Sequence, residues 1–169
     1  ADGERVRDYR ILAPTEWNFH PQGAVARGLA KLEAVDEATL AFQARLFVTA
    51  AVHGDELNGI EIIRRLSAMA VLKRLRGTLI LVPVVNVFGV LNHSRYLPDR
   101  RDLNRSFPGS ERGSLAARLA NLVTTEIIAG STHGIDLHTG AIHRSNLPQI
   151  RGDMADEDIR TMAQAFGVP

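Results

Sequence analysis

The chain has 169 residues, 45% of them hydrophobic and 23% charged, and a formal net charge of +1, which is typical of a globular domain with a buried core. This charge gives no reason to expect nucleic acid as a partner, and no apolar stretch reaches the roughly 18 residues that span a membrane. The absence of cysteine excludes disulfides and cysteine-based zinc sites, and it fits a cytoplasmic protein.

The first 45 residues give the weakest structural signals. Residues 1–10 are charged and lack the apolar segment of a secretory signal. Tyr9–Ala13 is compatible with a short strand, whereas Ala24–Val35 fits a helix or a strand about equally well. We expect residues 1–169 as a whole to form one domain.

A strand, a helix and a second strand are predicted from Leu46 onwards. The apolar run Leu46–Ala51 predicts a buried strand, and Asn58–Arg74 has helical spacing. One face of this helix would carry Ile62, Ile63, Leu66, Met69 and Ala70. After Gly77, the β-branched run Thr78–Val85 predicts a further strand, in which Pro83 indicates a bulge or an edge position. Such a unit implies two parallel strands joined by a right-handed crossover.

The second half continues the alternation of helices and strands. Phe88–Gly113 has no periodicity, and a loop of this length inside a compact domain is more often functional than not. Ser114 is a plausible N-cap for a helix that Gly130 ends. The remaining predicted elements are strands at Gly134–Thr139 and Leu147–Arg151 and a helix at Asp156–Phe166. This alternation predicts a three-layer α/β/α sandwich.

Two of the predicted strands end in residues that can bind a metal. His53 and Glu56 follow the strand Leu46–Ala51 across a turn that contains glycine, and His138 lies at the end of the strand Gly134–Thr139. In open α/β sheets, ligands bind beyond the carboxyl ends of the strands. A catalytic zinc site takes three protein ligands and leaves one position open for water. The three residues together therefore predict a metal site.

Each of these residues also has a simpler interpretation. Glu56 could complement the dipole of the helix that follows it, and His138 could be a half-buried histidine with ordinary hydrogen bonds. His133 and His143 are rival ligands, but neither follows an apolar strand. Asp136 lies two residues before His138 on the same strand face, so it either orients a group of the site or is a hydrogen-bonded strand residue.

Four motifs occur along the chain in a characteristic order. They are His53-Gly-Asp-Glu56, Asn86 with Arg95 nine residues on, Asp102-Leu-Asn-Arg-Ser-Phe-Pro-Gly109 and Asp136-Leu-His-Thr-Gly140. In this combination the chain resembles the succinylglutamate desuccinylases and aspartoacylases, relatives of the zinc carboxypeptidases, over about Leu46 to Arg151. The resemblance implies a mixed, mainly parallel sheet and one Zn²⁺ per chain, held by His53, Glu56 and His138.

The same resemblance implies an activity and a substrate class. Arg95 would polarise the scissile carbonyl and stabilise the oxyanion, while Asn104 and Arg105 would grip the carboxylate of a small anionic acylamino acid. The implied reaction is zinc-dependent hydrolysis of the amide bond, which releases a carboxylate and an amino acid.

The chemistry of the segment from Arg95 to Arg112 is compatible with these roles. Its five arginines exceed its three acidic residues by two, which suits an anionic substrate, although most charged runs are ordinary solvated surface. A guanidinium beside the reacting carbonyl can act like an oxyanion-hole donor, and Arg105 is a bidentate fork for a carboxylate. We expect Asp102 to pair with a neighbouring arginine and to hold the loop in place.

The chain departs from the family pattern at two points. Val87 follows Asn86 where the family usually has proline, which alters a turn and removes no chemical group. The general-base glutamate of the family lies well downstream of the third ligand, and Glu157, whose setting indicates a helix start, is the only glutamate after His138. We therefore expect the N-terminal catalytic part of a longer enzyme, able to bind metal but impaired in turnover. An exposed sheet edge would then favour a homo-oligomer.

Two other functions share the same residues. In a carboxypeptidase-like enzyme, Asn104 and Arg105 would hold the C-terminus of a peptide. A non-catalytic metal- or ligand-binding module is favoured if 169 residues are the full length. Two histidines and one carboxylate suit zinc but also accommodate cobalt, manganese or iron.

Overall fold

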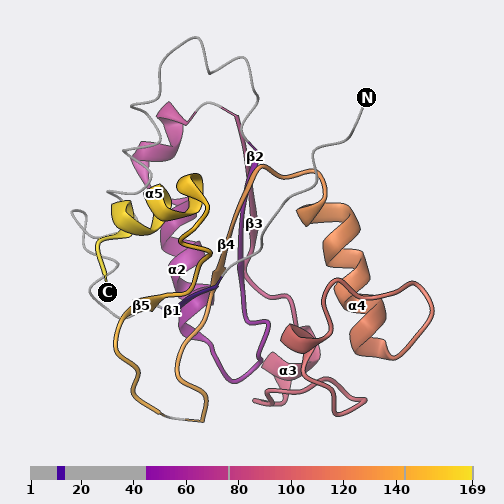
Figure 1. The fold of residues 1–169 in the computed structure, drawn as a ribbon. Coiled ribbons are helices and arrows are strands. Elements are labelled where there is room, and N and C mark those ends of the chain that lie inside the picture. Colours follow the sequence, from indigo (N-terminus) through magenta and orange to yellow (C-terminus); the bar gives the residue numbers. More distant parts are fainter. Residues whose placement is uncertain (1–10, 14–44, 76, 143, 169) are drawn as a thin grey trace, which may run out of the picture.

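The structure is a computed structural model that describes residues 11–13, 45–75, 77–142 and 144–168 (Figure 1). Its centre is one five-stranded sheet with the strand order β3-β2-β4-β1-β5. The strands are β1 (Ile11–Ala13), β2 (Arg45–Ala50), β3 (Thr78–Val82), β4 (His133–Leu137) and β5 (Gln149–Ile150). The α-helices are α2 (Asn58–Ser67), α3 (Val87–Leu91), α4 (Leu115–Val123) and α5 (Glu157–Phe166).

The sheet is mixed and mainly parallel, as predicted. Strand β2 pairs in parallel with β3 on one side and with β4 on the other, and β1 is parallel to β4. Only β5, which pairs with β1, runs antiparallel among the described strands. The parallel register aligns Ala50 at the end of β2 with Leu137 at the end of β4, so the segments that follow these two strands leave the sheet side by side.

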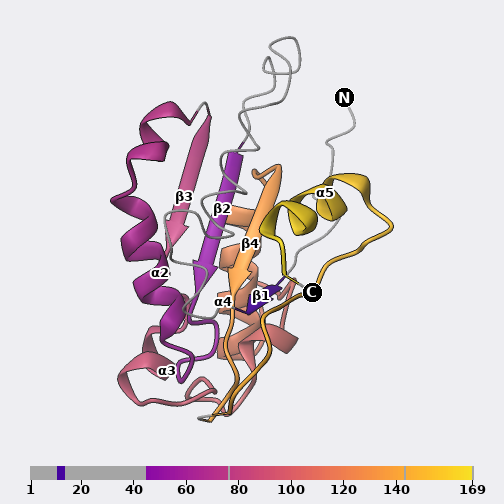
Figure 2. The same cartoon turned by 90° about the vertical axis from the view of Figure 1, so that its left-hand side faces the viewer.

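Alternating side chains of β2 build the cores on the two faces of the sheet. Leu46 and Val48 face α2 and α5, in a core whose other buried members include Ile62, Ile63, Leu66 and Phe166. Phe47 points to the opposite face, where its core includes Ala116, Ala120 and Val123 of α4. Figure 2 shows α2 and α4 on opposite sides of the sheet. The predicted three-layer α/β/α sandwich is therefore confirmed.

The first predicted helix and the strand that follows it are shorter than expected. The helix predicted for Asn58–Arg74 ends at Ser67, because Met69 is extended with a ψ of 133°, and a separate 3-10 turn covers Ala70–Arg74. The strand predicted for Thr78–Val85 ends at Val82, immediately before Pro83, which has no N–H to donate to a ladder. Strand β3 lies at an edge of the described sheet, in agreement with the edge position that Pro83 indicated.

The segment Phe88–Gly113, predicted to lack regular structure, contains two short helical elements. Helix α3 begins after Asn86, whose side-chain oxygen accepts a hydrogen bond from the backbone N–H of Gly89. A 3-10 turn at Leu103–Arg105 is anchored by Leu103, which is completely buried. Each of these elements is too short to produce a periodic pattern in the sequence.

Helix ends near the C-terminus follow the predicted signals closely, whereas the strands predicted at Gly134–Thr139 and Leu147–Arg151 cover His133–Leu137 and Gln149–Ile150. Ser114 caps α4, which continues as a π-helical turn at Thr124–Ile128, before Gly130. Asp156 caps α5, and Gly167 ends it with a φ of 72°.

The predicted strand at the N-terminus is described only in part. Its last residues form β1, whereas Tyr9 and the segment Ala24–Val35 lie outside the described residues. Within the described part of the chain, none of the helices combines the length and the apolar character needed to cross a bilayer.

Candidate metal centre

The loop after β2 carries the first two predicted ligands and is held by close backbone contacts. Ala51 turns the chain out of the strand with a φ of 50°. The N–H of Gly54 donates to the carbonyl oxygen of Ser94 at 3.1 Å. A Cβ at Gly54 would lie 1.9 Å from the carbonyl carbon of Gly89, so only glycine allows the loop to pack this closely on α3. The position of His53 and Glu56 therefore depends on the neighbouring helix.

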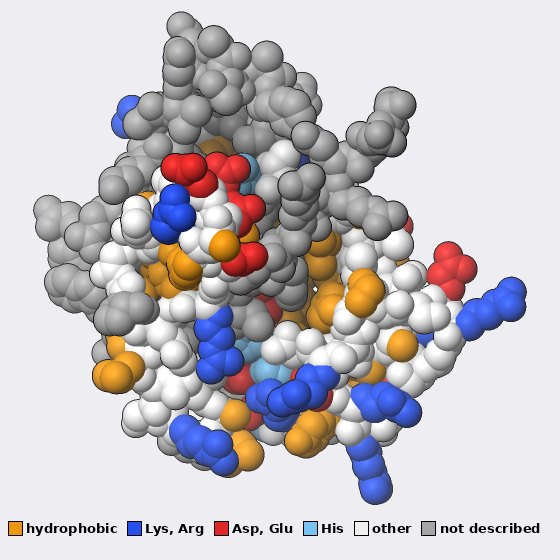
Figure 3. Space-filling view, viewed as in Figure 1, with side chains coloured by type: hydrophobic (Ala, Val, Ile, Leu, Met, Phe, Trp, Pro, Cys, Tyr) orange, Lys and Arg blue, Asp and Glu red, His pale blue; other side chains and the backbone are white. Residues whose placement is uncertain are grey.

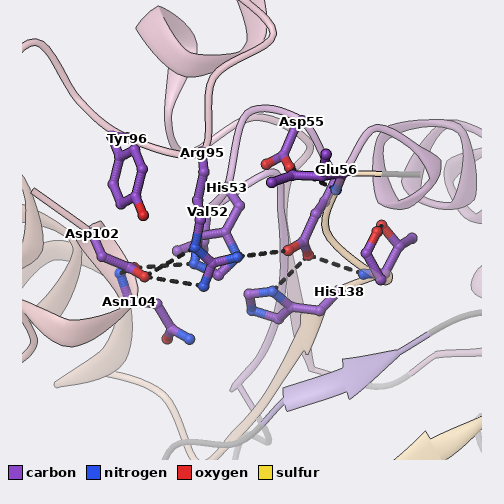
Figure 4. A network of polar contacts seen from close by, with 12 residues as sticks. Val52, His53, Asp55, Glu56, Arg95, Tyr96, Asp102, Asn104 and His138 are labelled. Carbon is purple, nitrogen blue, oxygen red and sulfur yellow. Dashed lines mark hydrogen bonds and ion pairs between the residues drawn. The ribbon is translucent and has the colours of Figure 1, made fainter. Parts of the chain in front are cut away.

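The structure brings His53, Glu56 and His138 together, as the sequence predicted (Figure 4). All three side chains are buried, and one potential ligand atom from each lies within 4.8 Å of the others. The Nδ1 atom of His53 lies 2.8 Å from Oε1 of Glu56, and the Nδ1 atom of His138 lies 2.9 Å from Oε2. One carboxylate thus faces the same nitrogen of both imidazoles.

The other ring nitrogens of the two histidines also contact carboxylates. Nε2 of His53 lies 3.1 Å from Oδ1 of Asp102, and Nε2 of His138 lies 2.7 Å from Oδ2 of Asp136. An ionised carboxylate only accepts hydrogen bonds, so each aspartate favours the tautomer that carries its proton on Nε2. The Nδ1 atoms of both rings point at Glu56, so either a proton on Nδ1 or a bound cation must lie between each ring and this carboxylate. This donor set fits a metal ion, and ligand histidines commonly have such carboxylate partners.

The pKa of Glu56 is lowered and the pKa of His138 is raised, because in each case hydrogen bonds to the charged form outweigh the effect of burial. Burial favours the neutral form of Glu56, but hydrogen bonds from His138 and His53 outweigh it and hold the pKa of this carboxyl far below its usual value. Burial likewise opposes charging of His138, yet Asp136 and Glu56 raise the pKa of this imidazole to about 9. The site therefore favours positive charge around an ionised Glu56.

Arg95 and Asp102 extend the cluster toward the surface. The Nε and NH2 groups of Arg95 donate to Oδ2 of Asp102 at 3.2 and 3.0 Å, and its NH1 group lies 3.3 Å from Oε1 of Glu56. The expected pairing of Asp102 with an arginine is thus observed. Asp102 also contacts His53, so its role is wider than holding the loop.

Asn104 and Arg105 lie at the rim of the cluster. The backbone N–H of Asn104 donates to Oδ1 of Asp102 at 2.9 Å, and Figure 4 shows the Asn104 side chain beside Asp102. The Arg105 side chain is 84% exposed, and its Nε lies 3.8 Å from Oδ2 of Asp102. The grip on a substrate carboxylate predicted for these two residues remains a prediction.

The rival ligands are not part of the cluster. The Nδ1 atom of His133 contacts the Thr132 hydroxyl at 2.8 Å, and His143 lies outside the described residues. Two contacts of the site were not predicted from the sequence. The backbone N–H of Thr139 donates to Oε2 of Glu56, and the Thr49 hydroxyl donates to Asp136. Both contacts depend on strand register, which no local motif encodes.

The chain is similar to proteins of one enzyme family over most of its length. Residues 43–169 match the succinylglutamate desuccinylase/aspartoacylase catalytic domain. The N-alpha-acetyl-L-2,4-diaminobutyric acid deacetylase of Halomonas elongata is 33% identical over 128 residues, covering 72% of this chain and 37% of that protein. A solved succinylglutamate desuccinylase/aspartoacylase from Rhodobacter sphaeroides is 32% identical with a TM-score of 0.54, covering 59% of this chain and 30% of the other.

A shorter similarity joins the chain to a protein of another kind. The hydrogenase expression/formation protein HoxV of Cupriavidus necator is 61% identical over 36 residues, which cover 21% of this chain and 9% of that protein. This similarity covers too little of the chain to bear on the metal centre.

The chain spans 37% of the length of the Halomonas deacetylase. The match over residues 43–169 shows that the chain belongs to the succinylglutamate desuccinylase/aspartoacylase family.

Proposed function

We propose that the chain provides the metal centre of a zinc-dependent hydrolase that cleaves the amide bond of an N-acyl amino acid. The observation that carries this proposal is the convergence of His53, Glu56 and His138, with an aspartate on the outer nitrogen of each imidazole. Two imidazoles and one carboxylate form a donor set typical of catalytic zinc. When bound, zinc supplies Lewis acidity and lowers the pKa of a coordinated water.

Arg95 is placed to stabilise negative charge that develops on the scissile carbonyl oxygen. Asp102 holds the guanidinium by two nitrogens, which leaves NH1 directed toward Glu56 and the ligand cluster. An oriented cation costs little reorganisation when charge develops, and one such donor is typically worth a factor of about 10² to 10³ in rate. In this proposal Arg95 is the catalytic residue closest to the metal ligands.

The surface beside the cluster suits a small anionic substrate. Figure 3 shows Lys and Arg side chains next to histidine surface on this face of the molecule. The exposed fork of Arg105 and the amide of Asn104 would bind the carboxylate of the acylamino acid. The named deacetylase among the relatives favours this substrate class over a peptide C-terminus.

Hydrolysis also needs a proton acceptor, and Glu157 is not placed to be one. Its side chain is 85% exposed and lies 3.7 Å from Arg160, one turn further along α5. Figure 1 shows α5 away from the carboxyl ends of β2 and β4, where the ligands lie. The base of the proposed reaction is therefore a group other than Glu157.

The first test is the zinc content of the purified chain and of three variants. We expect about one zinc per chain, lost in His53→Ala and His138→Ala because each removes one of three ligands. Arg105→Ala should keep the zinc and weaken binding of N-acetylaspartate by about tenfold, since it loses one charge-assisted hydrogen bond to the carboxylate. Arg112→Ala removes the same charge and should bind this probe normally.

The outcomes separate the parts of the proposal. Full zinc occupancy in both histidine variants would refute the ligand assignment. Equal weakening in Arg105→Ala and Arg112→Ala would show that net charge, and not a specific grip, binds the carboxylate. Release of a free amine from N-acetyl or N-succinyl amino acids, dependent on zinc and on Arg95, would establish the reaction class.

A further inference from the structure

Thr49 is the only polar residue of the run Leu46–Ala51, and it lies in the middle of the sheet. Its side chain is completely buried, and it pairs across the parallel ladder with Asp136 of β4. The Thr49 hydroxyl donates to Oδ1 of Asp136 at 2.8 Å, with the carbonyl oxygen of Ile135 a more distant acceptor at 3.4 Å. The hydroxyl is therefore directed at the carboxylate.

Asp136 needs such a donor because it is itself completely buried. A buried carboxylate is strongly destabilising unless its oxygens accept hydrogen bonds. Thr49 contacts one oxygen and Nε2 of His138 contacts the other, at 2.7 Å. The two contacts fix the plane of the Asp136 carboxylate and, with it, the direction in which the His138 ring lies.

We propose that Thr49 is a positioning residue of the metal centre, acting through Asp136 on His138. This inference rests on the proposed metal function of the site. By holding Asp136, the hydroxyl keeps Nε2 of His138 directed at this carboxylate and Nδ1 directed at Glu56, where the ligand atoms converge. A partner of a ligand histidine typically changes metal affinity by about 10- to 100-fold when it is removed, and Thr49 acts one contact further out.

A purely structural role for Thr49 predicts a different result. A β-branched residue in a central strand is expected for packing alone, and valine has nearly the same shape. If the hydroxyl only forms a stabilising hydrogen bond inside the sheet, Thr49→Val changes the stability of the chain but not its metal affinity. If it positions Asp136, zinc affinity falls even though the chain remains folded.

The experiment measures the zinc affinity of the full chain by competition with a chromophoric chelator, in Thr49→Val, Thr49→Ser and Val48→Ala. We expect about tenfold weaker binding in Thr49→Val and near-normal binding in Thr49→Ser, which keeps the hydroxyl. Val48→Ala is the matched control, because Val48 is buried in the same strand and belongs to the core on the other face. It should lower stability and leave zinc affinity unchanged.

Four results would overturn the inference, and one of them also concerns the proposed function. Unchanged affinity in a folded Thr49→Val, or equal weakening in Val48→Ala, would refute the positioning role alone. A parent chain that binds no zinc would refute the metal centre and this inference together. If Thr49→Val does not fold, the nitrogen-15 spectrum of the zinc-loaded parent decides: an exchange-protected proton on Nε2 of His138 supports the contact with Asp136, and rapid exchange contradicts it.

Discussion

Each of the two histidines of the candidate metal centre lies between two carboxylates. His138 lies between Glu56 and Asp136, and His53 lies between Glu56 and Asp102. Two imidazoles and the carboxylate of Glu56 converge where little water can screen them, an arrangement that fits a cation. Because Asp136 and Glu56 lie beside His138 only in the folded chain, the protonation of His138 depends on folding.

The raised pKa of His138 predicts how stability depends on pH when a chelator is present. Its two carboxylate partners raise the pKa of His138 to about 9 in the folded chain, against an ordinary value of 6.5, so folding is coupled to proton uptake. This contribution is complete below pH 6.5 and is lost as the pH rises through 9. We expect the free energy of unfolding to fall by on the order of 3 kcal/mol over this range. Urea titrations in EDTA would measure it, and His138→Gln, which cannot titrate, should remove this decrease.

At the scale of elements, the loop after β2 is held by α3. Asn86 caps α3, and its side-chain amide also donates to the carbonyl oxygen of Val52 at 3.4 Å. Val87, where the family usually has proline, is the first residue of α3, a position that does not need its N–H. The departure from the family pattern therefore leaves the cap and the metal loop intact.

The contact between Gly54 and Gly89 predicts a strong effect of a small substitution. Gly54→Ala would place a Cβ 1.9 Å from the backbone of Gly89, so the metal loop or α3 must move. We expect a loss of about 1 to 3 kcal/mol in the free energy of unfolding, together with weaker zinc binding. Gly113→Ala is a suitable control, because its Cβ would meet only the Ala117 side chain, at 3.3 Å. Zinc binding as tight in Gly54→Ala as in the parent would contradict this account.

At the scale of the whole molecule, the candidate metal centre joins the ends of two neighbouring parallel strands. His53 and Glu56 follow β2, and His138 follows β4, the strand paired with it. These segments are distant in sequence, so a metal ion that binds all three residues binds only the folded chain. Metal binding should therefore stabilise the whole sheet.

Zinc is expected to raise the thermal unfolding temperature of the chain. At a free zinc concentration about 100 times the dissociation constant, binding to the folded state alone adds about 2.7 kcal/mol to the free energy of unfolding. Differential scanning calorimetry with zinc and with chelator would measure the shift. His138→Ala should show little or none of it. An equal shift in that variant would mean that zinc stabilises the chain at another place.

The sequence by itself determined the features that depend on neighbouring residues. Apolar periodicity located β2, α4 and α5, and the capping residues Ser114 and Asp156 marked helix starts because a cap is a local hydrogen bond. The clustering of His53, Glu56 and His138 could be predicted because they follow apolar strands, and parallel strands in one sheet bring their carboxyl ends together.

Only the tertiary structure decided which side chains hold the ligands in place. Asp102 contacts His53 across 49 residues, and Thr49 contacts Asp136 across 87. The first contact depends on how a long loop returns, and the second on the register of two strands, neither of which leaves a local pattern. The exposure of Arg105 and the close packing of Gly54 on Gly89 were likewise settled by the folding of α3 and the turn Leu103–Arg105 beside the sheet. These contacts join side chains that are far apart in the sequence, so only the packing of the whole chain determines them.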